Sequence, residues 1–349
     1  MNIHEKYINR CIELAKNGLG ATYPNPMVGS VVVLNDTIIG EGWHRKAGES
    51  HAEVNAINSV NDKTLLKEAT IYVNLEPCSH YGKTPPCANL IVEKGIKNVV
   101  IGSIDTNSKV KGKGVEHLKK HGCNVIVGVL ENECKNLNKR FFTFHNKKRP
   151  FIILKWAETV DGFFDKLRNE ADENSPNWIS NQYSQQLSHK MRAENESILV
   201  GTTTALNDNP NLNVRNWSGQ NPVKIVIDKT LKIPLNYNLF KGSSKIIVFT
   251  EEYFEKRVAK NMFFEKIDFS KNIPKQICDV LYRLEIQAVI IEGGAKTLQS
   301  FIDENLWDEA FVFMGNVLFH NGLKAPKLKK TPIRIEKVLT DTLKIYSNK

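Results

Sequence analysis

The sequence predicts two consecutive α/β domains. Its 349 residues exceed what one ordinary hydrophobic core holds, and helical and strand patterns alternate through both halves. A short basic stretch that ends in proline, His145–Pro150, separates the halves. We therefore expect one domain over residues 1–146 and a second over residues 147–349.

In the first half, apolar residues at helical spacing predict a helix over 3–17. Two strands then flank an Asn35-Asp36 turn, and helices and strands alternate to the end of the half. The expected strands cover 28–34, 37–43, 70–75, 98–101 and 124–127, and the expected further helices begin near 51, run from Pro85 to about 94, and cover about 115–121 and 131–144. This order is typical of a layered α/β domain.

In the second half, the alternation starts again after Pro150. The expected strands cover 151–157, 197–201, 223–228, 244–250, 287–291 and 309–314, and the expected helices cover 181–194, 274–284 and 295–304. Between the first strand and the first helix, the loop 163–177 is charged and shows no period. The pattern again predicts an α/β domain.

The composition bounds the partners and the compartment. A net charge of +10 suggests an anionic partner, either nucleic acid or a phosphorylated small molecule. Because the lysines are scattered, we favour the small molecule and expect no nucleic-acid partner. No apolar run approaches the ~20 residues of a membrane span, and the N-terminus has no apolar signal region. Six cysteines without a disulfide pattern fit a cytoplasmic protein, and a homo-oligomer is compatible with the sequence.

Four side chains of the first half predict a catalytic zinc site. His51-Ala52-Glu53 is followed by Pro77-Cys78 and then by Cys87. Zinc binds imidazole and thiolate, and a catalytic site keeps its fourth position for water. We therefore expect one Zn²⁺ per chain on His51, Cys78 and Cys87, with Glu53 as a proton carrier that does not bind the metal.

Two other interpretations of these residues stay open. Ser50 and Glu53 have the spacing of a capping box, in which both only cap a helix. His80 could complete a four-ligand structural zinc site, although its spacing of two residues from Cys78 favours a place over the pocket.

The residues around this motif indicate a specialised substrate. Nucleobase deaminases have Pro-Cys-x-x-Cys, whereas eight residues separate Cys78 from Cys87 and bring His80 and Lys83 to the site. A lysine there can bind a phosphate or a polar ring substituent, or it can simply be solvated. Asn25 lies between two prolines, where its amide could read the edge of a pyrimidine or form a plain turn, and His44 after a strand is equally ambiguous.

The second half lacks the Gly-x-Gly-x-x-Gly fingerprint of dinucleotide binding. A strand instead ends in Glu292-Gly293-Gly294 before a helix, where backbone amides can bind a pyrophosphate or form an ordinary tight turn. Arg192 and Arg215 are either surface residues or a bidentate phosphate clamp.

Both halves resemble one family, the bifunctional riboflavin-biosynthesis deaminase-reductases. The motifs that carry the resemblance are Asn25-Pro26-x-Val28-Gly29, His51-Ala52-Glu53, the stretch from Glu76 to Cys87, Arg149-Pro150-Phe151, Lys155-x-Ala157, Asp161-Gly162, Trp178-Ile179-Ser180, Leu199-Val200-Gly201, Asp208-x-Pro210-x-Leu212 and Glu292-Gly293-Gly294. The resemblance implies a cytidine-deaminase-like three-layer domain followed by a dihydrofolate-reductase-like α/β domain.

The resemblance also implies the reactions. The first domain would deaminate 2,5-diamino-6-(phosphoribosylamino)pyrimidin-4-one hydrolytically with zinc, and the second would reduce the ribosyl group to ribityl with NADPH. In the first domain the implied substrate contacts are Asn25, His44, His80 and Lys83. In the second, the implied substrate contacts are Arg192, Leu212, Arg215 and Glu292, and the implied cofactor contacts are Ala157, Trp178, Thr204, Asp208, Gly293 and Gly294.

Three alternatives remain at this point. The chain could be a deaminase of nucleic-acid bases, a structural zinc module that binds a phosphorylated ligand, or a deaminase whose second domain is inactive.

Overall fold

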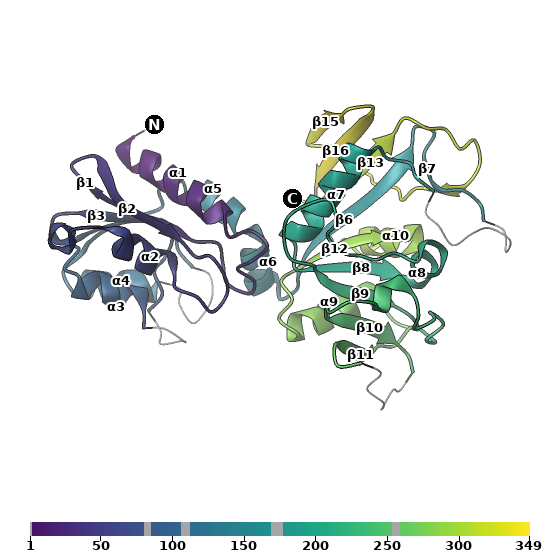
Figure 1. Ribbon diagram of the computed structural model, residues 1–349, viewed down its shortest axis with the longest axis horizontal. Coiled ribbons are helices and arrows are strands. Elements are labelled where there is room, and N and C mark those ends of the chain that lie inside the picture. Colours follow the sequence, from purple (N-terminus) through teal and green to yellow (C-terminus); the bar gives the residue numbers. More distant parts are fainter. Residues whose placement is uncertain (1, 80–84, 106–111, 169–176, 253–258) are drawn as a thin grey trace. The chain divides into compact units, whose positions relative to one another are not determined.

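The computed structural model describes residues 2–79, 85–105, 112–168, 177–252 and 259–349. The chain forms two compact units, Met1–Lys148 and Arg149–Lys349 (Figure 1). The division falls two residues after the position expected from the sequence.

The first unit is built on a five-stranded sheet in the order β2-β1-β3-β4-β5 (Figure 1). Its strands are β1 (Gly29–Leu34), β2 (Thr37–Trp43), β3 (Thr70–Leu75), β4 (Asn98–Ser103) and β5 (Asn124–Val127). Its helices are α1 (Ile3–Lys16), α2 (Ala52–Ser59), the 3-10 helix η1 (Lys63–Lys67), α3 (Cys87–Glu93), α4 (Lys113–Lys120), α5 (Glu131–Leu137) and α6 (Lys139–Lys147). Strand β1 is antiparallel to β2 and β3, whereas β3, β4 and β5 are parallel.

Helices cover both faces of this sheet. Successive residues of a strand point to opposite faces, and β1 is apolar on both. Val32 packs in a core with α2, α3 and α4, whereas Val31 and Val33 pack in another with α1 and α5. The first unit therefore has three layers, as predicted.

The single helix expected over 131–144 is divided in the structure. Helices α5 and α6 meet at Asn138, which is 2% exposed. Its side chain accepts a hydrogen bond from the Met27 backbone N–H at 2.8 Å and donates one to the Met27 carbonyl at 2.9 Å. Helical spacing could not reveal this contact, because its partners are 111 residues apart.

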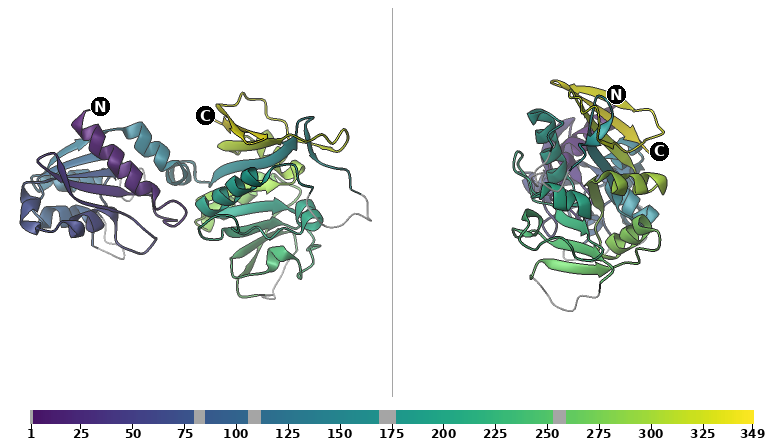
Figure 2. Two further views of the ribbon diagram at one scale, coloured as in Figure 1. Left: turned by 45° about the horizontal axis from the view of Figure 1, so that its top comes forward. Right: turned by 90° about the vertical axis from the view of Figure 1, so that its right-hand side faces the viewer.

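The second unit holds a nine-stranded sheet in the order β11-β10-β9-β8-β12-β6-β13-β16-β15 and a small sheet of β7 and β14 (Figure 2). The strands are β6 (Phe151–Thr159), β7 (Phe163–Asp165), β8 (Ser197–Gly201), β9 (Val223–Ile227), β10 (Ile246–Thr250), β11 (Met262–Lys266), β12 (Ala288–Gly293), β13 (Glu309–Gly315), β14 (Leu323–Lys324), β15 (Arg334–Val338) and β16 (Asp341–Ser347). The helices are α7 (Gln182–Glu194), α8 (Thr202–Asp208), the 3-10 helix η2 (Asn238–Phe240), α9 (Ile273–Arg283) and α10 (Ala295–Asp303).

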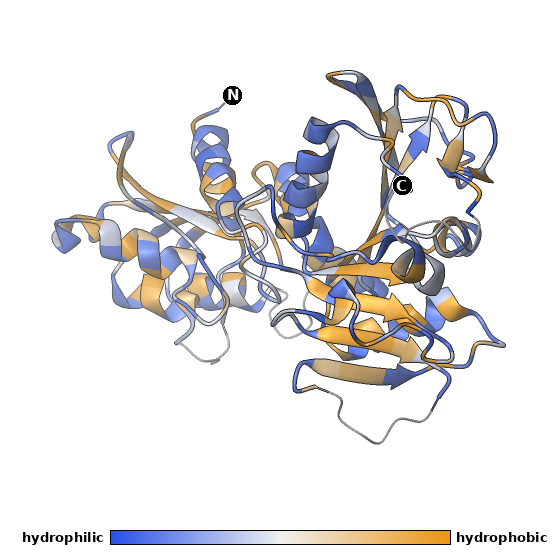
Figure 3. Ribbon diagram, turned by 45° about the vertical axis from the view of Figure 1, so that its right-hand side comes forward, coloured by the Kyte–Doolittle hydropathy of each residue, from blue (hydrophilic) through white to orange (hydrophobic). Residues whose placement is uncertain are grey.

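The seven strands from β11 to β13 are parallel. At the end of the sheet, β16 pairs antiparallel with β13, and β15 pairs antiparallel with β16. The central strands are almost entirely apolar, as expected for strands buried on both faces (Figure 3). Their carboxyl ends meet at one edge of the sheet. Helices α8 and α10 begin at that edge, directly after β8 and β12.

The sequence did not predict β7, α8, β11, β14, β15 or β16. The edge strand β15 illustrates the difficulty. Its sequence is Arg-Ile-Glu-Lys-Val, and its residues are mostly exposed. Charges on an edge strand hide the strand pattern, although they protect the edge from further pairing.

A buried ion pair connects the start of the second unit to its sheet. Arg149 donates from Nη1 and Nη2 to the two carboxylate oxygens of Asp308, at 2.6 and 2.9 Å. The same carboxylate accepts the Ile152 backbone N–H at 2.9 Å. Both side chains are about one-tenth exposed, so this charge pair depends on its partners for compensation.

We expect Asp308→Asn to destabilise the second unit by about 3 kcal/mol, because it leaves the buried Arg149 without a counter-charge. The free energy of unfolding from denaturant titration measures this. The control is Asp279→Asn, which breaks an exposed pair with Lys275 and should cost less than about 1 kcal/mol. Equal effects of the two variants would contradict the role given to the buried pair.

Candidate functional site

The three predicted metal ligands of the first unit lie together. His51 precedes α2, Cys78 follows β3, and Cys87 is the first residue of α3. Nδ1 of His51 is 3.5 Å from Sγ of Cys78 and 3.3 Å from Sγ of Cys87, and all three ligand atoms lie within 4.8 Å of one another. Ligand atoms on a tetrahedral zinc with bonds of about 2.0–2.3 Å are roughly 3.5 Å apart. The donor set therefore fits zinc.

The local chain geometry favours this use over helix capping. The N-cap of α2 is His51, and its side chain makes no capping hydrogen bond. Ser50 and Glu53 therefore do not form the capping box that their spacing allowed. The first N–H of α3 donates to Sγ of Cys78 at 3.3 Å, which favours a thiolate. Hydrogen bonding with Cys87, and then with His51, lowers the pKa of Cys78 to about 4.

Glu53 lies beside the ligands on the first turn of α2 and is 3% exposed. Burial, followed by the nearby charge of Cys78, raises the pKa of its carboxyl to about 7. A bound divalent cation would favour the ionised form. A buried carboxyl in this place can take up and release a proton near neutral pH.

Two of the four predicted substrate contacts of this unit lie next to the ligands. The ring of His44 is edge-on to that of His51, with centroids 5.4 Å apart. Because a carbonyl can only accept, Nδ1 of His44 donates to the Ser50 carbonyl at 3.1 Å, and Nε2 then accepts from the Asn25 amide at 3.1 Å. This pairing fixes the orientation of the Asn25 amide. His80 and Lys83 lie outside the residues that the structure describes.

The second unit has a cavity of about 480 Å³ at the carboxyl edge of its parallel strands. Eight of the ten residues predicted for the reductase half line it, namely Ala157, Trp178, Arg192, Thr204, Asp208, Leu212, Arg215 and Glu292. The remaining two, Gly293 and Gly294, flank it, because a Cβ atom on either would lie 3.0–3.1 Å from Oγ1 of Thr204. Distant segments of the chain therefore meet in one site.

Arg192 and Glu292, which both line this cavity, form an ion pair. Arg192 donates from Nε and Nη2 to the two oxygens of Glu292, at 2.9 and 2.7 Å, and from Nη1 to the Asn213 carbonyl at 3.2 Å. Burial alone would raise the pKa of Glu292, but Arg192 and then Lys155 lower it to about 2. Arg192 is therefore not the ordinary surface arginine that the sequence left open, and the Glu292 carboxyl stays ionised.

Other polar residues that line the cavity come from both described ends of the loop 163–177 and from the end of α8. Arg168 donates from Nη2 to Asp208 at 2.8 Å and from Nε to Asp165 at 3.0 Å. Trp178 is 63% exposed, so it is not a core residue. Leu212 is buried with a φ of +51°, which bulky residues rarely adopt.

Comparisons with known proteins agree over most of the chain. The model of the cytidine and deoxycytidylate deaminase zinc-binding region matches residues 1–103, and that of the RibD C-terminal domain matches residues 150–329. The riboflavin biosynthesis protein RibD of Aquifex aeolicus is 40% identical over 324 residues, which cover 92% of this chain and 89% of the relative. The chain belongs to the RibD family.

Solved structures support the RibD assignment. The diaminohydroxyphosphoribosylaminopyrimidine deaminase/5-amino-6-(5-phosphoribosylamino)uracil reductase of Thermotoga maritima is 38% identical, with a TM-score of 0.87. RibD of Acinetobacter baumannii, form 1, is 30% identical, with a TM-score of 0.88. Each match covers 98% of this chain and 98% of the other.

Membership of the RibD family confirms several predictions. The chain combines a cytidine-deaminase-like domain and a reductase domain, and it is both a zinc-dependent deaminase and an NADPH-dependent reductase. A small-molecule substrate of riboflavin biosynthesis is confirmed at that level of detail. No helix among the described residues is long and apolar enough to cross a membrane.

The sequence analysis gave no role to three residues of these RibD sites, Glu76, Lys155 and His189, although Glu76 and Lys155 belong to motifs that carry the resemblance. Lys155 could have been given a role, since it is the one charge in the apolar run Phe151–Ala157. Glu76 and His189 act through backbone groups distant in sequence, so spacing gives no signal for them.

Glu76 anchors the segment that carries Cys78. Its carboxylate is 4% exposed and accepts four backbone N–H groups: those of Asp105, Gly112, Gly114 and Val115, at 2.8–3.2 Å. A Cβ atom on Gly114 would lie 2.1 Å from the Pro77 carbonyl oxygen, so the start of α4 packs directly against the ligand segment. Loss of one of these hydrogen bonds should let the segment that carries Cys78 move more freely.

We expect Glu76→Gln to weaken zinc binding by about 10–100-fold. The NH₂ group of the new side chain would replace one carboxylate oxygen and would face backbone N–H groups, which are donors themselves. Competition with a chromophoric chelator measures the affinity. The control is Glu116→Gln at an exposed position of α4. Equal zinc affinity in the two variants would show that Glu76 does not position the ligands.

Proposed function

We propose that this chain catalyses two consecutive steps of riboflavin synthesis. The first unit removes an amino group from a diaminopyrimidine that carries a phosphoribosylamino group, and the second reduces the ribosyl group of the product to ribityl. The observation that supports the first step is the ligand triad of His51, Cys78 and Cys87 with buried Glu53 beside it. The second step is supported by a cavity that holds two arginines and the Glu292 ion pair.

In the deamination step, His51, Cys78 and Cys87 would hold zinc, which would lower the pKa of a bound water toward neutrality. Glu53 takes the proton of the attacking water and delivers it to the leaving amine. Asn25, oriented by His44, presents its amide to the pyrimidine edge. His80 and Lys83, which lie outside the described residues, remain predicted substrate contacts.

In the reduction step, NADPH supplies hydride. We assign its binding to Ala157, Trp178, Thr204, Asp208, Gly293 and Gly294. The substrate side is formed by Arg192, Leu212, Arg215 and Glu292. Arg192 has five N–H groups, of which three bind Glu292 and Asn213, so two remain for a phosphate. We call Arg192 and Arg215 the phosphate clamp.

The proposal places both reactions on a free small molecule in the cytoplasm. It assigns no nucleic-acid or membrane partner, and a homo-oligomer stays compatible with it. The eight-residue insert between Cys78 and Cys87 distinguishes the site from the Pro-Cys-x-x-Cys of nucleobase deaminases.

We expect Glu53→Gln to retain about one zinc per chain and to lose ammonia release by at least about 100-fold, because a general acid–base group typically contributes that much. Metal analysis and an ammonia assay with the pyrimidine ribotide measure the two effects. Glu49→Gln, an exposed neighbour, should behave as wild type. Retained deamination in Glu53→Gln would reject the role of Glu53.

We expect Arg215→Ala to raise the KM for the deaminated ribotide by about 10–100-fold, because it removes hydrogen bonds to a charged group. Ammonia release should not change. Steady-state oxidation of NADPH measures the reductive step, with Arg283→Ala on the exposed face of α9 as the control. An unchanged KM would remove Arg215 from the phosphate clamp.

A further inference from the structure

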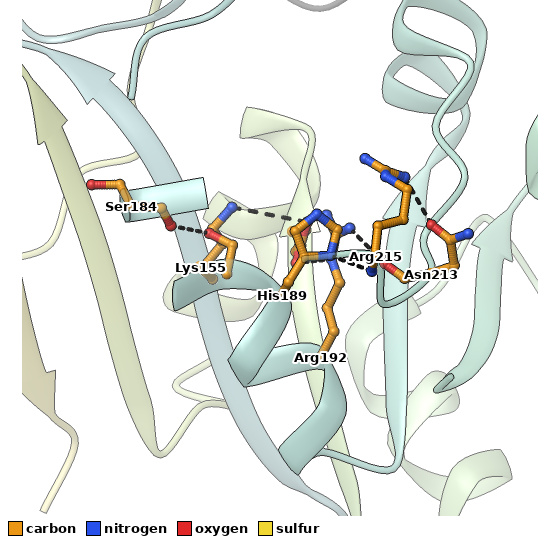
Figure 4. Close-up of polar contacts among 8 residues, drawn as sticks. Lys155, Ser184, His189, Arg192, Asn213 and Arg215 are labelled. Carbon is orange, nitrogen blue, oxygen red and sulfur yellow. Dashed lines mark hydrogen bonds and ion pairs between the residues drawn. The ribbon is translucent and has the colours of Figure 1, made fainter. Parts of the chain in front are cut away.

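His189 lies behind the phosphate clamp without belonging to the cavity wall. It is on α7, three residues before Arg192, and it is 5% exposed. It is not among the described residues that line the cavity. Figure 4 shows it beside Arg192, with both side chains next to the segment that carries Asn213 and Arg215. A buried histidine close to two arginines calls for a physical reason.

The ring of His189 binds the backbone of Arg215. The Arg215 N–H donates to Nδ1 of His189 at 3.2 Å. Because a backbone N–H can only donate, Nδ1 carries the lone pair and the ring proton is on Nε2. A protonated ring would lose this acceptor and would add a positive charge beside two arginines.

The surroundings keep the ring neutral. Burial, followed by the charges of Arg192 and Arg215, lowers the pKa of His189 to about 4, against the opposing effects of Glu292 and the Asn213 backbone. At neutral pH the ring is therefore an acceptor at Nδ1.

Helix α7 holds the segment 213–215 at two points. One turn after His189, Arg192 donates to the Asn213 carbonyl at 3.2 Å. The Arg215 side chain in turn donates from Nη1 to Oδ1 of Asn213 at 2.8 Å. The backbone of the segment is fixed by α7, and the direction of the Arg215 guanidinium follows from that backbone.

We propose that His189 is a positioning residue of the reductase site, which fixes the backbone of Arg215 through Nδ1 so that the phosphate clamp is formed before substrate arrives. Its target is the phosphate monoester of the ribotide. The inference rests on the proposed function, since it requires that Arg192 and Arg215 bind this phosphate. It predicts an effect on substrate binding and little effect on the chemical step.

Two amide variants test which ring nitrogen matters. The Oδ1 atom of Asn can occupy the position of the acceptor Nδ1, whereas the amide of Gln reaches only the position of Nε2, where its NH₂ group replaces the ring N–H. We expect His189→Asn to bind inorganic phosphate and ribose 5-phosphate within about twofold of wild type, and His189→Gln to bind both about tenfold more weakly. Isothermal titration calorimetry on the full-length protein measures these affinities.

Steady-state kinetics should show an effect on substrate binding without an effect on the chemical step. His189→Gln should raise the KM for the deaminated ribotide about tenfold, while kcat and the affinity for NADPH change by less than about twofold. Ammonia release by the same chain serves as an internal control for folding. Equal phosphate affinities of the Asn and Gln variants, whether both normal or both weakened, would overturn the proposal.

The Arg215→Ala background separates this inference from the function on which it rests. If His189 acts through Arg215, adding His189→Gln to Arg215→Ala should weaken phosphate binding by less than about twofold. A full additional tenfold loss would show that His189 acts elsewhere. If Arg215→Ala itself binds phosphate as wild type does, the phosphate clamp is wrong, and the His189 proposal is rejected with it.

Discussion

Compensation of buried carboxylates is the constraint on which both sites depend. Glu76 binds four backbone N–H groups, Glu292 binds Arg192, and Asp308 binds Arg149. A buried charge without such partners is costly, so each carboxylate fixes the segments that supply its partners. At Glu76 these segments include the start of α4, which packs against Pro77. At Glu292 the partner is a residue of the phosphate clamp.

The layered fold could be predicted because its strands obey simple periodicities. The continuous apolar run of β1 serves two cores, and the parallel strands of the second unit are mostly continuous apolar runs as well. The prediction failed where local pattern and tertiary contact disagree. Asn138 divides a periodic helix because it satisfies the backbone of Met27, and β15 has the composition of a charged loop because it lies at a sheet edge.

The zinc ligands could be predicted because the chemistry restricts the residue types. Only a few side chains bind zinc, and the structure brings His51, Cys78 and Cys87 together. The reductase residues came from family resemblance, because arginines and glycines are common in any sequence. The sequence could assign no role to Glu76 or His189, since each accepts hydrogen bonds from backbone groups whose position depends on the complete fold.

The ion pair of Arg192 affects how the cavity selects among anions. Because Glu292 already cancels the charge of this arginine, its long-range attraction for small inorganic ions is weak. Two of its five N–H groups, one on Nη1 and one on Nη2, are not used by Glu292 or Asn213. The ion pair also holds the side chain in place, so much of the side-chain entropy of Arg192 is already lost before any ligand binds.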